Sequence, residues 1–154
     1  MKQTLAIAAL CLGLAACAST GRLSTAQKLD LYRAHAGPPQ QDMPLYGSLS
    51  GWTELGESAL AVWTRPSEGY LLELAGPCQG LDYAPAIGLT SRVGRVSARF
   101  DKVLVHDPTP GPMNMPCFIS SIRKLDTKAL RASEQELRQA QLQEREEGQQ
   151  APTR

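Results

Sequence analysis

Hydrophobic residues between positions 45 and 125 occur in short runs that alternate with turn residues, a pattern that predicts β-strands. Residues 59–64 are apolar on both faces, and residues 70–74 place Tyr70, Leu72 and Leu74 on one side. Turn residues at 65–69 join these runs into a predicted β-hairpin. Further strands are expected at 86–90, 98–105 and 117–123, with a turn at Gly94 and a proline-rich loop at 107–116. Five or six strands predict a mainly β fold, a small antiparallel barrel or curled sheet.

Helical spacing flanks the predicted strands on both sides. Ser24 is placed to cap a short N-terminal helix that ends before Gly37, which opens a Gly-Pro-Pro sequence. Residues 127–147 are rich in Ala, Leu, Glu, Gln and Arg, which favours a C-terminal helix. Its apolar stripe is thin, with Leu130 and Leu137 seven residues apart, so we expect it to pack by its first turns and to fray towards Gly148.

The first residues have the pattern of a removable leader. Lys2 precedes an apolar run at 5–14, and ten residues would rise only about 15 Å as a helix, half of a bilayer core. The run ends in Leu14-Ala15-Ala16-Cys17, which resembles the lipobox of bacterial lipoproteins. That resemblance implies that residues 1–16 are removed and that Cys17 becomes an acylated first residue and a membrane anchor. An ordinary cleavage site that leaves Cys17 unmodified is the alternative. Ala18 favours an outer-membrane location facing the periplasm, because retained inner-membrane lipoproteins usually carry Asp there.

The composition bounds the remaining possibilities. The chain has 154 residues, 42% hydrophobic and 20% charged, which suits one domain with a real core. Loss of Lys2 with the leader leaves 15 basic residues against 15 acidic ones, so no charge excess points to nucleic acid as a partner. No cofactor is predicted.

Two of the four cysteines, Cys78 and Cys117, remain once Cys11 leaves with the leader and Cys17 is acylated. In an oxidising compartment a disulfide between them would close a loop of about 40 residues and stabilise the fold by roughly 3 to 4 kcal/mol. A metal pair and a redox pair are the alternatives. The only histidines, His35 and His106, show no close ligand spacing, and no C-x-x-C sequence is present, so no metal site is predicted.

The chain therefore divides into four predicted segments. These are a lipoprotein signal peptide at 1–16, a tether and short helix at 17–43, a disulfide-linked β domain at 44–125, and a polar helix with a frayed tail at 126–154.

A possible anion-binding site is the clearest chemical candidate. Four cations recur at three- and four-residue steps, and from one face they would bind lipid headgroups, phosphorylated sugars or peptidoglycan carboxylates: Arg92, Arg95, Arg99 and Lys102. A solvated surface paired with nearby carboxylates is the alternative. Four aromatic residues could line a sugar-stacking groove or lie in the core: Tyr46, Trp52, Trp63 and Tyr70.

No catalytic residue is predicted. Ser58 lacks the second glycine of a nucleophile elbow, and His106 with Asp107 follows a strand end, where a lone histidine is usually solvated. Four carboxylates could include a pair of the kind that glycan-cleaving enzymes use, but solvation is their default: Glu54, Glu57, Asp82 and Asp101.

Several short sequences together carry a family resemblance. They are Leu14-Ala15-Ala16-Cys17, Ala61-Val62-Trp63-Thr64-Arg65-Pro66, Leu74-Ala75-Gly76-Pro77-Cys78, Arg99-Phe100-Asp101-Lys102-Val103, and Pro116-Cys117 followed by Ile122-Arg123. With these motifs the chain resembles a family of small Gram-negative envelope lipoproteins catalogued only as a domain of unknown function. The resemblance covers about residues 24–125. It implies a shared fold and the Cys78–Cys117 pair, and it carries no activity.

The sequence therefore favours a membrane-anchored, periplasm-facing lipoprotein that is a non-enzymatic binding or structural module, with an envelope protein or glycan as its partner. The alternative is an enzyme acting on envelope glycans or lipids through Asp101, His106 and the arginines. A third hypothesis is an accessory subunit that docks through residues 127–154.

Overall fold

The computed structural model describes residues 22–106 and 116–150, with side chains described to residue 146. The predicted leader, the lipidation site Cys17, Asp107 and most of the predicted proline loop lie outside the described residues. The elements, in chain order, are α1 (Thr25–Ala34), β1 (Ala36–Gln40), β2 (Asp42–Pro44), β3 (Gly51–Glu54), β4 (Ala59–Arg65), β5 (Glu68–Leu74), the 3-10 helix η1 (Leu81–Tyr83), β6 (Ala86–Leu89), β7 (Arg95–Ser97), β8 (Lys102–His106), β9 (Cys117–Leu125) and α2 (Thr127–Gln150).

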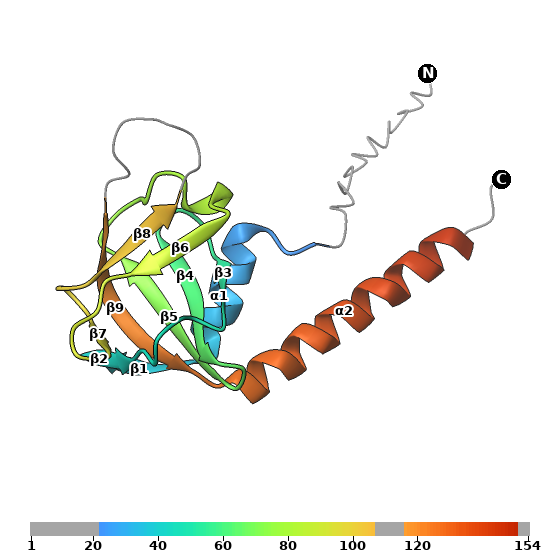
Figure 1. Ribbon diagram of the computed structural model, residues 1–154. Coiled ribbons are helices and arrows are strands. Elements are labelled where there is room, and N and C mark those ends of the chain that lie inside the picture. The colour runs from blue at the N-terminus through green and yellow to red at the C-terminus, as the bar shows by residue number, and fades with distance from the viewer. Residues whose placement is uncertain (1–21, 107–115, 151–154) are drawn as a thin grey trace, which may run out of the picture.

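Seven strands form one antiparallel sheet, in the order β3-β4-β5-β9-β8-β6, with β1 paired to β9 outside this path (Figure 1). The predicted hairpin is confirmed, because β4 and β5 pair from Ala59 opposite Glu73 to Arg65 opposite Glu68. Strand β9 organises the sheet: one edge pairs with β5, and the other pairs with β8 at its beginning and with β1 at its end. The mainly β prediction with two helices is thereby confirmed.

Of the two predicted architectures, a barrel or a curled sheet, the barrel is wrong, because the sheet does not close. Among the described strands, β3 and β6 lie at the two ends of the sheet and do not pair with each other. A separate two-stranded ribbon of β2 and β7 covers the inner face instead. Met43 of β2 and Val96 of β7 are fully buried there, against side chains such as Val62, Leu72 and Ile122. The ribbon hides the apolar face, so the core forms without closure.

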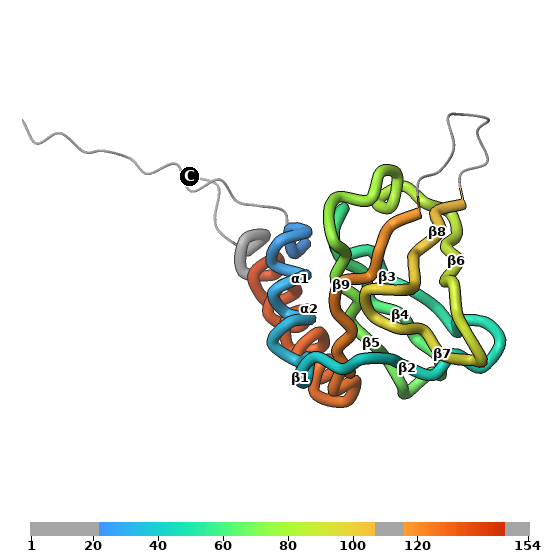
Figure 2. The backbone as a smooth tube through the Cα atoms, turned by 90° about the vertical axis from the view of Figure 1, so that its left-hand side faces the viewer, coloured from blue at the N-terminus to red at the C-terminus, as the bar shows by residue number. Residues whose placement is uncertain are grey.

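The outer face of the sheet packs against α1 and the first turn of α2. Figure 2 shows both helices on this side of the sheet, and Figure 1 shows that α2 then leads away from the sheet and from α1. Residues 59 and 61 of β4 are alanines on this face, and Gly69 of β5 has no side chain, so the helical segments approach the strands closely. A Cβ atom at Gly69 would lie 3.2 Å from the Thr127 Cγ2 atom of α2. Strand β4 is therefore buried on both faces, as the apolar run at 59–64 predicts.

The N-terminal helix begins as predicted, with Ser24 as its N-cap. The Ser24 hydroxyl accepts from the Gln27 backbone N–H, and the Gln27 side chain accepts from the Ser24 backbone N–H, which completes a capping box. The helix ends at Ala34, but the following Gly-Pro-Pro residues join β1 instead of forming a tether. Proline is tolerated there because β1 lies at an edge, and the Arg123 guanidinium donates to the backbone carbonyls of Ala36 and Gly37.

Two predicted boundaries differ from the structure. The strand expected from Ala98 begins only at Lys102, because residues 98–101 form a turn in which Arg99 has a φ of 70°. The Asp101 carboxylate fixes this turn by accepting from the Ser97 backbone N–H at 2.8 Å and from the Thr90 hydroxyl at 2.7 Å. Helix α2 continues to Gln150, past Gly148, where fraying was expected.

Cys78 and Cys117 form a disulfide, with their Cα atoms 5.6 Å apart. Cys78 is fully buried in the inner core and follows β5, whereas Cys117 begins β9. The beginning of β9 pairs with β8 through only two residues, so the covalent bond adds a restraint where the strand ladder is short.

Candidate functional site

The predicted anion site is only partly assembled, because two of its four cations already have partners. The Arg95 guanidinium forms an ion pair with Asp42 across the β2–β7 ribbon, and this hydrogen bond raises the pKa of Arg95. The Lys102 ammonium lies 4.6 Å from the ring centroid of Phe118. Arg92 faces Arg95 across the turn at Gly94, and Arg99 is exposed on the turn before β8. The anion-site hypothesis required the four cations to share one face, and in the structure two turns, at Gly94 and at residues 98–100, lie between them.

The carboxylates and histidines are dispersed. Asp101 is only 3% exposed and fully engaged in its turn, whereas His106 is exposed at the end of β8. The His35 ring Nε2 lies 3.0 Å from the Ser133 hydroxyl, at the junction of the two helices. Within residues 22–106 and 116–150, no group of three His, Cys, Asp or Glu side chains could hold a metal ion. In the same part of the chain, no helix is long and apolar enough to cross a membrane.

The four aromatic candidates lie in different environments and do not line one groove. Tyr70 is buried in the inner core, where burial and the neighbouring Glu68 raise its pKa, and Trp52 packs partly against the same core. Trp63 lies on the opposite face, edge-on to Tyr32. Tyr46 is exposed beneath the Arg65 guanidinium, 4.4 Å from it.

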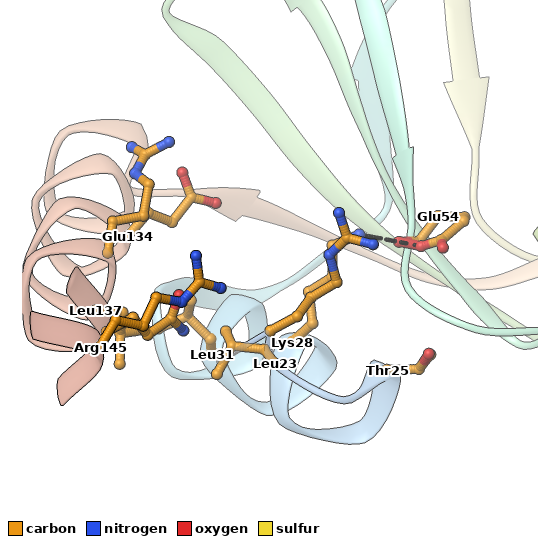
Figure 3. Close-up of a pocket in the computed structure, with 11 residues that line it drawn as sticks. Leu23, Thr25, Lys28, Leu31, Glu54, Glu134, Leu137 and Arg145 are labelled. Carbon is orange, nitrogen blue, oxygen red and sulfur yellow. Dashed lines mark hydrogen bonds and ion pairs between the residues drawn. The ribbon is translucent and has the colours of Figure 1, made fainter. Parts of the chain in front are cut away.

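A groove between α1 and α2 is one of several concave sites formed by the described residues, and it combines leucines with arginines (Figure 3). It has a volume of about 570 Å³ and is open to solvent. Its apolar residues are Leu23, Leu31 and Leu137, and Figure 3 shows them between the two helical segments. Polar and charged residues complete the lining: Arg22, Thr25, Lys28, Glu54, Glu134, Arg138, Gln141 and Arg145.

Two hydrogen bonds join the segment that ends α1 to the segment that begins α2, at one end of the groove. The Asp126 backbone N–H donates to the His35 carbonyl at 2.9 Å, and the Tyr32 hydroxyl donates to the Glu134 carboxylate at 3.1 Å. Burial of the Tyr32 ring and the negative charge of Glu134 raise the pKa of Tyr32. The end of α1 adjoins the start of α2, and the two helices diverge from there (Figure 1), so the groove is an open wedge lined on one side by residues near the start of α1 and on the other by residues of α2 between 134 and 145.

Some charged side chains of the groove have partners in the structure and others do not. Glu54 forms an ion pair with Lys28 at 3.1 Å, and Glu134 is engaged by Tyr32. The three arginines that line the groove have no ion-pair partner within the described part of the chain: Arg22, Arg138 and Arg145. An apolar floor beside unpaired guanidinium groups is suited to an anion attached to a short apolar group.

Sequence reasoning missed this groove. Arg138 and Arg145 are seven residues apart, so they share one face of α2 next to Leu137. That stripe was available in the sequence, but its alignment with α1 depends on how the two helices dock.

The fold and the groove together define a small disulfide-bonded β-sheet protein with two helices on the outer face of its sheet. The chain belongs to a family of unknown function, DUF6491, whose model matches residues 1–141. Searches of curated proteins and of solved structures each found no match.

Proposed function

We propose that this protein is a bacterial envelope lipoprotein, anchored through an acylated Cys17 in the outer membrane and facing the periplasm. We propose further that it acts as a non-enzymatic binding or structural module with an envelope protein or glycan as its partner. The observation that carries the proposal is the Cys78–Cys117 disulfide, because such bonds persist in oxidising compartments and are rare in the bacterial cytosol. The apolar run at 5–14 and the sequence Leu14-Ala15-Ala16-Cys17 give the export and lipidation signals.

The disulfide also supports export as a condition of folding. It joins residues 39 apart in sequence, and a loop of that length is worth roughly 3 to 4 kcal/mol on the chain-entropy model. A domain of this size is stable by only about 5 to 15 kcal/mol, so the bond is a large share of its margin. Oxidation after export would therefore stabilise the domain in the compartment where the anchor holds it.

The use of the polar groups supports binding over catalysis. Asp101, the most buried carboxylate described, is occupied by hydrogen bonds to Thr90 and Ser97 that hold a turn. His106 lies exposed at the end of β8, away from that buried position. The cations of the helix groove, in contrast, remain available to a ligand.

Replacement of Cys17 tests the anchor. The Cys17→Ser variant should lose palmitate labelling and leave the membrane fraction, whereas Cys11→Ser, in the leader, should keep both. Stable membrane association is expected from three acyl chains at about 0.8 kcal/mol per buried methylene. Unchanged labelling in Cys17→Ser would contradict the proposed lipidation.

Membrane sorting and compartment are tested separately. Ala18→Asp should move the protein to the inner membrane on sucrose-gradient fractionation. A non-reducing peptide map of the protein from cells should recover Cys78 linked to Cys117. Free thiols at both positions would place the protein in a reducing compartment and refute the export proposal.

A further inference from the structure

We propose that the groove between α1 and α2 binds the headgroup of an anionic phospholipid in the membrane that carries the Cys17 anchor. The site therefore holds the domain against the membrane in a fixed orientation. This inference rests on the proposed lipidation, and it adds a second, headgroup-specific contact to the acyl anchor.

The covalent chain sets the distance between the anchor and the groove. Arg22, which lines the groove, is five residue steps along the chain from Cys17, with four residues between them. A fully extended chain spans at most about 3.6 Å per residue, so the groove lies within about 18 Å of the acylated cysteine. That span is no more than about the radius of a small domain plus the thickness of the headgroup layers. The end of the groove at Arg22 therefore stays close to the membrane surface.

The chemistry of the groove matches a phosphate attached to an apolar group. Arg138 and Arg145 share one face of α2, and Arg22 lies on the facing segment. Guanidinium groups bind phosphate oxygens through two parallel hydrogen bonds, so these cations suit a phosphodiester. Leu23, Leu31 and Leu137 lie half-buried beside them, where they can contact the glycerol and the first methylenes of a lipid.

The carboxylates of the groove do not oppose an anion strongly. Glu54 forms an ion pair with Lys28. Glu134 accepts a hydrogen bond from Tyr32 at the end of the groove where α1 ends and α2 begins. Three other acidic residues of α2 with described side chains are exposed and do not line the groove: Glu136, Glu144 and Glu146. The groove therefore has a surplus of positive charge at the end nearest the anchor.

The acyl chains of Cys17 are the rival occupant, since the same short tether would bring them into reach. The observations favour the headgroup because the groove is lined by three arginines that have no ion-pair partner in the described part of the chain, beside only three leucines. A buried acyl chain would be expected to have an enclosed apolar wall, without three unpaired guanidinium groups.

Hydrogen exchange on the acylated full-length protein tests the proposal. The protein is reconstituted into vesicles of phosphatidylcholine alone or of phosphatidylcholine with phosphatidylglycerol, and exchange of the backbone amides of α1 and residues 137–146 is followed by mass spectrometry. Exchange of these amides should slow only in the vesicles that contain phosphatidylglycerol, and not in those of phosphatidylcholine alone. The protection should fall about fivefold for each arginine removed in Arg138→Gln and Arg145→Gln, from the usual contribution of one cation near an anionic surface.

The matched control is Arg92→Gln combined with Arg99→Gln, which removes the same charge from exposed turns of the β domain. This control should keep the lipid-dependent protection. Glutamine is a good helix former, and unchanged thermal unfolding of the Arg138 and Arg145 variants would establish that they fold.

Each other outcome overturns the inference in a distinguishable way. Protection that is equal in both vesicle types and insensitive to Arg138 and Arg145 would assign the groove to the acyl chains of Cys17. If the control variant lost the lipid-dependent protection to the same extent, the effect would be one of general surface charge and not of the groove. No incorporation of the wild-type protein into either vesicle type would refute the anchor itself, and the groove inference with it.

Discussion

The turn between Arg92 and Arg95 offers a substitution that should stabilise the protein. Two backbone hydrogen bonds join these residues, N–H of each to C=O of the other, at 2.9 and 3.0 Å. The central residues Val93 and Gly94 both have positive φ, 51° and 69°. Positive φ at both positions defines the type I′ turn of two-residue hairpins, for which Asn-Gly is the favoured sequence. A β-branched residue in this conformation is a steric outlier, so Val93→Asn is the change to make.

The magnitude follows from strain alone, because the side chain contributes no burial. Val93 is 101% exposed, so its replacement removes no packing contact from the core. The left-handed conformation costs an ordinary residue about 1 to 2 kcal/mol, and asparagine tolerates it far better. We expect Val93→Asn to raise the free energy of unfolding by about 1 kcal/mol. For a domain of this size that raises Tm by about 3 to 5 °C.

Thermal and urea unfolding, followed by circular dichroism with the disulfide intact, measure this gain. Val93→Ala is the matched control, because alanine is not β-branched but still resists positive φ, so its stability should lie between those of the wild type and the asparagine variant. An asparagine variant less stable than the wild type would refute the reasoning. Such a result would mean that residue 93 does not hold the left-handed conformation, or that its side chain has a partner in solution.

Three further predictions concern a buried carboxylate, a glycine under the helices and two buried tyrosines. Asp101→Asn should lower the free energy of unfolding by about 1 to 3 kcal/mol in urea, because an amide cannot accept from both donors that the carboxylate serves, while Glu57→Gln on the exposed surface should leave it unchanged. Gly69→Ala should cost about 1 to 3 kcal/mol in the same assay, since its Cβ would press on α2, and an unaffected midpoint would mean that the helix yields without cost. The raised pKa values of Tyr32 and Tyr70 favour their protonated forms in the folded state, so their contribution to stability is complete below their ordinary pKa of 10.0 and is lost as the pH rises beyond it. The double variant Tyr32→Phe, Tyr70→Phe should therefore lose less stability above pH 10 than the wild type. If the free energy of unfolding, measured in urea, fell equally steeply with pH in the two proteins, this assignment would be contradicted.

The features that could be predicted from the sequence are those set by local chemistry. The hairpin of β4 and β5 follows from an apolar run, a turn and a second run, all within residues 59–74. The start of α1 follows from the hydroxyl of Ser24, which caps the helix through contacts three residues away. The pairing of Cys78 with Cys117 was open to prediction because only two cysteines remain after the leader and the proposed acylation site.

The features that could not be predicted depend on contacts between distant segments. The Gly-Pro-Pro sequence reads as a helix stop, and only the position of β9 makes it an edge strand whose carbonyls Arg123 satisfies. The spacing of the four cations could not show whether they share one face, because that depends on the turn at Gly94 and on the turn that Asp101 holds, both of which lie between them.

The sequence by itself determined the mainly β character of this protein, its flanking helices and its covalent link, because each depends on side-chain periodicity or residue counts along one stretch of chain. Only the tertiary structure decided that the sheet stays open and that a groove forms between α1 and α2. The ribbon of β2 and β7 buries the inner face without closure, and the small residues at 59, 61 and 69 let α1 and the first turn of α2 pack closely on the outer face. Both outcomes depend on which distant surfaces pack together, and the pattern of residues within one segment does not determine that packing.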